Sequence, residues 1–184
     1  DGEIIHRFRR VSIGWKEYRK TDAHYREGTH FEKFTYGGKT FAVGLCGDLW
    51  TDGRPEEMRA LDADVVLWPV WCDYRADEWN STIKHEYAEQ AQKCGRRVLL
   101  INPCCADENA ADAAAGGAVD FRDGKIQAEL PAGNSGMLMI NVYSSPAPEA
   151  LMVNVFSPVL PSSARSSVTL PVGAVSVFVL KSPD

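Results

Sequence analysis

The stretch FAVGLCGDLW, residues 41 to 50, places a cysteine directly after an apolar run and follows it with glycine and aspartate. Unpaired cysteine is among the most buried residue types, so Cys46 has an ordinary interpretation as a core thiol. The position also suits a nucleophile, because a strand that ends there presents the thiol at the rim of a sheet, where open α/β sites usually lie. Gly47 would let the backbone approach a ligand closely. Cys46 is therefore a candidate nucleophile and Gly47 a candidate substrate-binding residue.

Nucleophilic cysteine chemistry also needs a base to take the thiol proton and a positive or hydrogen-bonding group to hold the oxyanion. The segment EYRKTDAHYREG, residues 17 to 28, offers Lys20 for the second role. The four histidines of the chain lie in no recognisable catalytic context, which disfavours a papain-like cysteine hydrolase.

The elements that must position these residues alternate between strand and helix. Apolar runs at 39–46 and 64–71 predict strands, and RPEEMRALDA between them predicts a short helix with Pro55 in its first turn. Residues 76–95 predict an amphipathic helix that ends at Gly95. Its apolar positions recur every three or four residues: Trp79, Ile83, Tyr87, Ala91 and Cys94.

The remaining patterned segments are all of strand type. RRVLLINP at 96–103 predicts a buried strand, residues 116–130 predict a hairpin that turns through RDG, and GMLMINV at 136–142 predicts one more strand. Alternating strands and helices followed by a hairpin favour a layered α/β sheet.

Composition limits the classes of partner. The 184 residues carry a net charge of −5 with a pI near 5.4, which disfavours nucleic acid and anionic membranes as the main partner. Five cysteines without C-x-x-C spacing predict neither a disulfide framework nor a zinc site, so we expect a reducing, cytoplasmic setting. The start lacks the apolar core of a signal peptide, and no run is long enough for a membrane span. The first residue is not Met, so we expect the chain to begin inside a longer gene product.

Composition changes near residue 144, which predicts a domain at 1–143 and a Pro/Ser-rich extended tail at 144–184. The tail holds six of the ten prolines, and AVSVFVL at 174–180 predicts a terminal strand that pairs with another element or another chain. This ending is similar to the closing strand of β-sandwich modules found in some glycosidases. That similarity leaves a carbohydrate-active protein as one alternative.

The motifs resemble, in colinear order over residues 1–143, those of the nitrilase superfamily, the carbon–nitrogen hydrolases. YRKTDAHYREGTHFEKFTYGGKTFAVGLCGDLW is similar to the central stretch of that family, with a Y-R-K motif followed by a strand that ends in C-x-D. The similarity continues through ALDADVVLWPVW, YAEQA, VLLIN, GGAVDFRDGKIQAEL and GMLMINV. The resemblance implies a nitrilase-like α-β-β-α sandwich, incomplete at the amino-terminal side.

The resemblance also implies roles for individual residues. Cys46 corresponds to the nucleophile, Lys20 to the lysine that stabilises the tetrahedral intermediate, and Glu27 lies near the supporting glutamate of the family. Trp71 falls where the family lines its substrate pocket. From this motif order we expect Cys46 to end a central strand, with the ammonium of Lys20 within a few ångströms of its sulfur. Each has a plainer interpretation: Lys20 and Glu27 as solvated surface charges, and Trp71 as a core aromatic.

One feature of the family pattern has no counterpart in this sequence. The general-base glutamate of the family lies well upstream of its lysine, and Glu3 is too close to Lys20 to be that residue. We therefore expect either a fragment of a full enzyme or, as an alternative, a truncated non-catalytic homologue used for binding or assembly.

The function implied by the resemblance is hydrolysis of a non-peptide carbon–nitrogen bond in an amide, a carbamoyl compound or a nitrile, through a cysteine thioester. This chemistry needs no metal and no organic cofactor. The expected partners are a small-molecule amide or nitrile substrate and further copies of the chain in a homo-oligomer.

Overall fold

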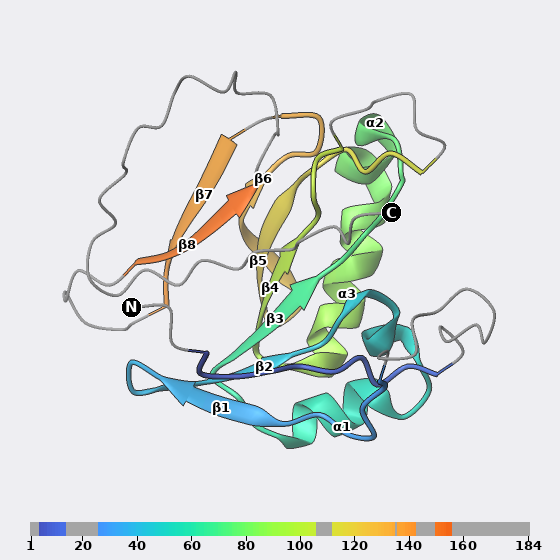
Figure 1. The fold of residues 1–184 in the computed structure, drawn as a ribbon. Coiled ribbons are helices and arrows are strands. Elements are labelled where there is room, and N and C mark those ends of the chain that lie inside the picture. The colour runs from blue at the N-terminus through green and yellow to red at the C-terminus, as the bar shows by residue number, and fades with distance from the viewer. Residues whose placement is uncertain (1–3, 14–25, 106–111, 135, 143–149, 156–184) are drawn as a thin grey trace.

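The computed structural model describes residues 4–13, 26–105, 112–134, 136–142 and 150–155, the last of these by backbone alone (Figure 1). Lys20 and the predicted terminal strand at 174–180 lie outside the described residues.

A six-stranded mixed sheet forms the centre of the described chain, in the order β1-β2-β3-β4-β5-β6. Its β2, β3 and β4 run parallel, and the other neighbouring pairs run antiparallel. The parallel strands read as nearly continuous apolar runs because both faces of the sheet are covered. The strands are β1 (Lys33–Tyr36), β2 (Lys39–Val43), β3 (Val65–Pro69), β4 (Arg97–Ile101), β5 (Ala118–Arg122) and β6 (Lys125–Leu130).

Two tight turns set the antiparallel pairs. The predicted hairpin at 116–130 is confirmed as β5 and β6, which turn through Asp123 and Gly124 with φ of 48° and 74°. The pair β1 and β2 was not predicted, although it turns through Gly37 and Gly38, both at positive φ. Two successive residues at positive φ make the hairpin turn whose twist matches that of the strands.

Helices cover one face of the sheet. The predicted helices are confirmed as α1 (Arg54–Ala60) and as a continuous run of α2 (Ala76–Glu78), the π-helical turn η2 (Trp79–Ile83) and α3 (Lys84–Cys94). Of the five apolar positions predicted to share one face, Ile83 is partly buried and the other four are buried in the core between helices and sheet. The core on this side thus follows the sequence pattern.

A second β layer covers the opposite face of the sheet (Figure 1). Its strands β7 (Gly136–Asn141) and β8 (Ala150–Val155) pair antiparallel, and Ile140 and Val142 pack in one buried cluster with Phe41, Leu67 and Leu99 of the six-stranded sheet. The described residues therefore build three of the four layers that the resemblance implies, in the order helix, sheet, sheet.

Strand β8 falls within the predicted tail. It pairs along its whole length with β7, from Gly136 opposite Val155 to Asn141 opposite Ala150. We predicted no strand here, because the proline and serine content of residues 144–184 indicated an extended tail. The domain boundary at residue 143 stays a prediction.

Candidate active site

Cys46 lies three residues beyond the end of β2, at the first position of the 3-10 turn η1 (Cys46–Trp50). Strand β2 is an interior strand between β1 and β3, as predicted, but the strand itself stops at Val43. The backbone of Cys46 has φ of 49°, in the left-handed region that L-residues other than glycine rarely adopt. Such strain persists only where surrounding contacts hold it, and it gathers at functional sites.

Gly44 makes the sharp exit from β2 sterically feasible. A Cβ atom at this position would lie 2.7 Å from both Cγ and Cδ2 of Leu49, which is fully buried beneath the turn. Because η1 folds directly back onto the strand end, only a residue without a side chain fits at this position. The amide of Gly44 still continues the ladder by donating to the carbonyl of Leu67.

Asp48 holds the turn closed from inside. Its carboxylate is fully buried and accepts hydrogen bonds from the amides of Leu45 at 3.0 Å and Ser12 at 2.7 Å. The Nε atom of Arg10 lies 3.8 Å from the same carboxylate and provides the opposing charge. Asp48 thus connects the segment around residues 10–12 to the residues that flank Cys46. Hydrogen bonds to a charged carboxylate are stronger than neutral ones, so this connection is firm.

An aromatic stack supports the other side of Cys46. The indole N–H of Trp68, a fully buried residue of β3, donates to the carbonyl of Cys46 at 3.0 Å. The Trp68 ring stacks on Tyr87 of α3 at 5.1 Å, and Trp50, at the end of η1, meets Tyr87 edge-on at the same centroid distance. The backbone of Cys46 is therefore fixed to the core.

Trp71 lies at the rim beside the Cys46 thiol. The S–H of Cys46 donates to the Trp71 carbonyl at a distance of 3.8 Å, and the Trp71 indole donates to the carbonyl of Asp112 at 2.9 Å. The side chain is 37% exposed, so its plainer interpretation as a core aromatic is wrong. Two of the predicted site residues thus lie together.

Asn102 and Cys72 complete this end of the sheet, and the sequence did not indicate either. The Asn102 side chain accepts from the amide of Cys72 and donates to the carbonyls of Cys72 and Gly116. The Cys72 sulfur lies 3.0 Å from the hydroxyl of Tyr87, and burial raises the pKa of this thiol to about 11. Cys72 could have been found in the sequence, because the apolar run that forms β3 leads to this cysteine.

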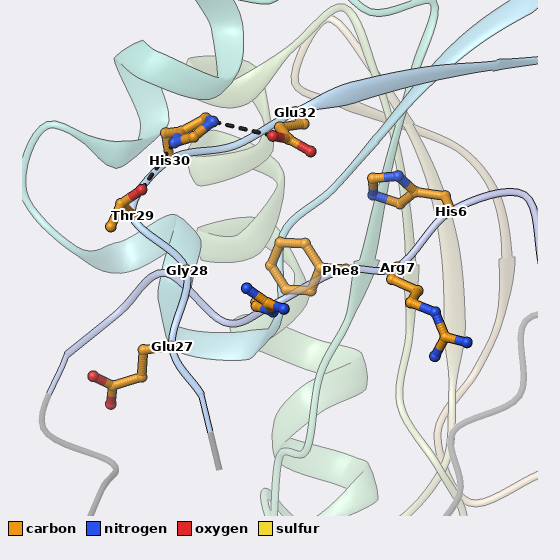
Figure 2. A pocket seen from close by; sticks show the side chains of 9 residues that line it. His6, Arg7, Phe8, Glu27, Gly28, Thr29, His30 and Glu32 are labelled. Atoms are coloured by element: carbon orange, nitrogen blue, oxygen red, sulfur yellow. Dashed lines mark hydrogen bonds and ion pairs between the residues drawn. The ribbon is translucent and has the colours of Figure 1, made fainter. Parts of the chain in front are cut away.

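Unlike Trp71, the predicted site residues Gly47 and Glu27 lie against Arg10 and in a separate cavity, respectively. A Cβ atom at Gly47 would lie 3.3 Å from a guanidinium nitrogen of Arg10, so this side of the glycine faces the protein. Glu27 lines a separate cavity of about 310 Å³, and Cys46 is not among the residues that line it. Figure 2 shows Glu27 extending away from the hydrogen bond between His30 and Glu32 in this cavity. No contact joins Glu27 to Cys46 in the described residues, and its predicted role stays a prediction.

The described part of the chain holds no group of three or more His, Cys, Asp or Glu side chains arranged to bind a metal ion. Its helices are also all too short or too polar to cross a membrane.

Solved structures with the same fold are known, whereas no protein-family model and no curated protein matches the sequence. Glutamine-dependent NAD+ synthetase from Acinetobacter baumannii is similar over 73% of this chain and 25% of its own, with 18% identity and a TM-score of 0.59. Nit3 from Saccharomyces cerevisiae, a member of branch 10 of the nitrilase superfamily, is similar over 73% of this chain and 47% of its own, with 20% identity and a TM-score of 0.53. An amidase mutant from Nesterenkonia sp. AN1 is similar over 67% of this chain and 45% of its own, with 19% identity and a TM-score of 0.50.

The described chain has the nitrilase-superfamily fold. This confirms the predicted fold class as an α/β, partial nitrilase-like arrangement. The chain spans less than half the length of these three structures, and at these identities the likeness concerns the fold alone.

Proposed function

We propose that this protein is part of a carbon–nitrogen hydrolase of the nitrilase type, with Cys46 as its nucleophile. The observation that carries the proposal is the strained turn at Cys46, with φ of 49°, at the rim of a nitrilase-fold sheet. A core thiol has no need of a left-handed backbone held from both sides by Asp48 and Trp68.

One of the similar structures supports a cysteine at the centre of the reaction. The Nesterenkonia amidase is described with the acetamide moiety of fluoroacetamide added covalently at its active-site cysteine. By analogy, the thiolate of Cys46 attacks the carbon of an amide, a carbamoyl group or a nitrile and forms a covalent bond to it.

Lys20 and backbone N–H groups would hold the negative charge that develops on the substrate oxygen or nitrogen. Ammonia or an amine then leaves, in the case of a nitrile only after a first water has added to the thioimidate, and a further water cleaves the thioester to regenerate the thiol. A glutamate takes the proton of Cys46 in this scheme, with Glu27 as the supporting carboxylate. No carboxylate is hydrogen-bonded to the Cys46 sulfur in the described residues, where its bond is to the Trp71 carbonyl. The proposal therefore assigns the base to a residue beyond those described.

The substrate in this proposal is a small molecule that lies against Trp71 and Gly47. Trp71 is partly exposed and its carbonyl contacts the Cys46 sulfur, so the proposal assigns its ring as an apolar wall of the substrate site. None of the steps requires a metal or an organic cofactor.

Fluoroacetamide tests the proposal directly. Its carbon–fluorine bond reacts poorly with ordinary thiols, so rapid transfer of a carbamoylmethyl group requires an activated cysteine. We expect Cys46 to be labelled much faster than Cys104, which is also partly exposed and serves as the internal control. Mass spectrometry of peptides measures both rates.

Turnover provides the second measurement. In a protein to which the upstream portion with the general base has been restored, Cys46→Ser should lower amide hydrolysis by about 10³-fold or more, because the hydroxyl is a far poorer nucleophile at neutral pH. Cys104→Ser should leave the hydrolysis unchanged. Equal labelling of Cys46 and Cys104, together with unchanged turnover in Cys46→Ser, would favour the non-catalytic alternative.

A further inference from the structure

We propose that Cys46 and Cys72 form a reversible intrachain disulfide when a hydroperoxide oxidises Cys46. Cys46 is the thiol that the peroxide attacks, and Cys72 is the thiol that resolves the product. This chemistry goes beyond the proposed hydrolysis and does not depend on it.

The fold brings the two thiols to the same edge of the sheet. Strands β2 and β3 are parallel neighbours, and Cys46 and Cys72 each lie three residues beyond the end of their strand. The Cys46 sulfur lies 3.8 Å from the carbonyl oxygen of Trp71, the residue directly before Cys72. A carbonyl oxygen is about 3 Å from the next Cα atom, so the Cys46 sulfur lies within roughly 7 Å of the Cys72 Cα atom.

The pKa shifts of Cys72 and Tyr87 agree with the proximity of the two thiols. Burial contributes most to the raised pKa of Cys72, and negative charge on Cys46 raises it further. Tyr87 is affected by both thiols, with its own pKa raised by burial first and then by Cys72 and Cys46. Cys46, Cys72 and Tyr87 therefore form one cluster beneath the rim.

The two thiols differ in solvent exposure, and this difference assigns them different roles. Cys46 is partly exposed, so a small peroxide reaches its sulfur, whereas Cys72 is only 5% exposed and is hydrogen-bonded to Tyr87. Burial and a raised pKa disfavour attack by peroxide on Cys72, so Cys46 is the thiol of this pair that is oxidised first. Buried Cys94, at the end of α3, and Cys104, packed against the opposite face of the sheet, have no contact with Cys46 in the described chain.

Oxidation of Cys46 and formation of the disulfide take place in two steps. The Cys46 thiolate attacks the distal oxygen of the hydroperoxide, the O–O bond breaks, and the products are a sulfenic acid on Cys46 and an alcohol or water. The Cys72 sulfur then attacks the Cys46 sulfur, the S–O bond breaks, and the hydroxyl leaves as water with the Cys72 proton. The two cysteines lose two electrons together, and the peroxide gains them.

Formation of the bond needs only local movement. Cys72 must exchange its hydrogen bond with Tyr87 for the bond to Cys46, and residues 71–75 belong to no helix or strand that would resist this shift. A disulfide requires its two Cα atoms within about 7 Å. The contact with Trp71 limits the distance from the Cys46 sulfur to the Cys72 Cα atom, so the shift of residues 71–75 has to bring the two Cα atoms into this range. The backbone clamp that Asn102 places on Cys72 limits how far the segment moves.

Peptide mapping of the 184-residue chain tests the proposal. After treatment with hydrogen peroxide under non-reducing conditions, we expect a crosslinked peptide that joins Cys46 to Cys72 and disappears with dithiothreitol. The wild-type chain is sufficient for this measurement, so it does not depend on the folding of a variant. A crosslink from Cys46 to Cys104 or Cys105 instead, or no crosslink while Cys46 becomes sulfinic acid, overturns the proposal.

Variants measure the protective effect of the second thiol. In Cys72→Ala, Cys46 should pass to sulfinic and sulfonic acid several-fold faster than in wild type, because no thiol resolves the sulfenic acid. Cys94→Ala is the matched control, since it also removes a buried thiol, and it should behave as wild type. Equal rates of over-oxidation in Cys72→Ala and Cys94→Ala contradict a resolving role. The fluoroacetamide experiment gives an independent result, so failure of either proposal is recognisable.

Discussion

Cys46 combines two properties that rarely occur together in a structural residue, namely partial exposure and a left-handed backbone. The strain at this position costs on the order of 1 kcal/mol for a residue that carries a Cβ atom. The hydrogen bonds to Asp48 and from Trp68 compensate for it. At the residue scale, the turn therefore holds the Cys46 sulfur at the rim of the sheet at a small cost in stability.

The strain predicts an unusual response to glycine. Cys46→Gly should be more stable than Cys46→Ala by about 0.5–1 kcal/mol, because glycine adopts φ of 49° without a clash. Denaturant unfolding of the two variants measures the difference.

Ala91 provides the matched comparison in a helix. Ala91→Gly, in the interior of α3, should lower the free energy of unfolding by about 1 kcal/mol. The sign of the glycine effect thus reverses between the two positions. Cys46→Gly less stable than Cys46→Ala would mean that the turn is not strained.

At the scale of elements, the site is assembled where three parallel strands end. Cys46 follows β2, Trp71 and Cys72 follow β3, and Asn102 follows β4. The carboxyl ends of parallel strands meet at one edge of a sheet, which is why open α/β sheets bind ligands there. Asn102 fixes this edge, since its side chain satisfies both backbone groups of Cys72.

Removal of the Asn102 side chain should loosen the edge. Asn102→Ala leaves the buried amide and carbonyl of Cys72 without their partner, and we expect a loss of about 2–4 kcal/mol in the free energy of unfolding. The same variant should increase the exposure of Trp71, and the change in fluorescence that is lost when Trp71 is also replaced by Phe measures this effect among the five tryptophans.

Asn134 supplies the control for this prediction. It is exposed, with a long 3.5 Å bond to the carbonyl of Pro131, and Asn134→Ala should change stability by less than about 0.5 kcal/mol. A comparable loss from both substitutions would show that Asn102 does not hold the edge.

At the scale of the described molecule, buried thiols connect stability to alkaline pH. Burial raises the pKa of Cys72 to about 11 and that of Cys94 to about 12, from an ordinary value of 9.0. Above pH 9 the unfolded chain releases these protons while the folded chain still keeps them. Because the unfolded state then binds fewer protons, stability falls as pH rises.

We therefore expect the free energy of unfolding to decrease between pH 9 and 11, by on the order of 1 kcal/mol per pH unit for each of the two thiols. Below pH 9 both states keep these protons, and the two thiols give no slope. Urea unfolding at closely spaced pH values measures the effect.

Substitution separates the contributions of the thiols from those of lysine and tyrosine. Cys72→Ala should flatten the slope between pH 9 and 11, and Cys72→Ala combined with Cys94→Ala should flatten it further. An unchanged slope in the double variant would place the alkaline sensitivity elsewhere in the chain.

The order and type of the main elements follow from the sequence alone, because they depend on local patterns. Spacing of three or four residues placed Trp79, Tyr87, Ala91 and Cys94 on the buried face of the long helix, where the structure has them. The RDG turn determined the β5–β6 hairpin in the same local way. Cys46 could be chosen as a candidate because an apolar run, a glycine and an aspartate frame it within ten residues.

Tertiary structure alone decided what surrounds that cysteine. Asp48 is a charged residue in the sequence, and its burial follows only from partners at residues 10 and 12, far away along the chain. The same holds for Cys72, whose position next to Cys46 results from the pairing of β2 with β3. Strand β8 likewise became apparent only through its pairing with β7. These features arise from contacts between segments distant in sequence, and no local pattern encodes such contacts.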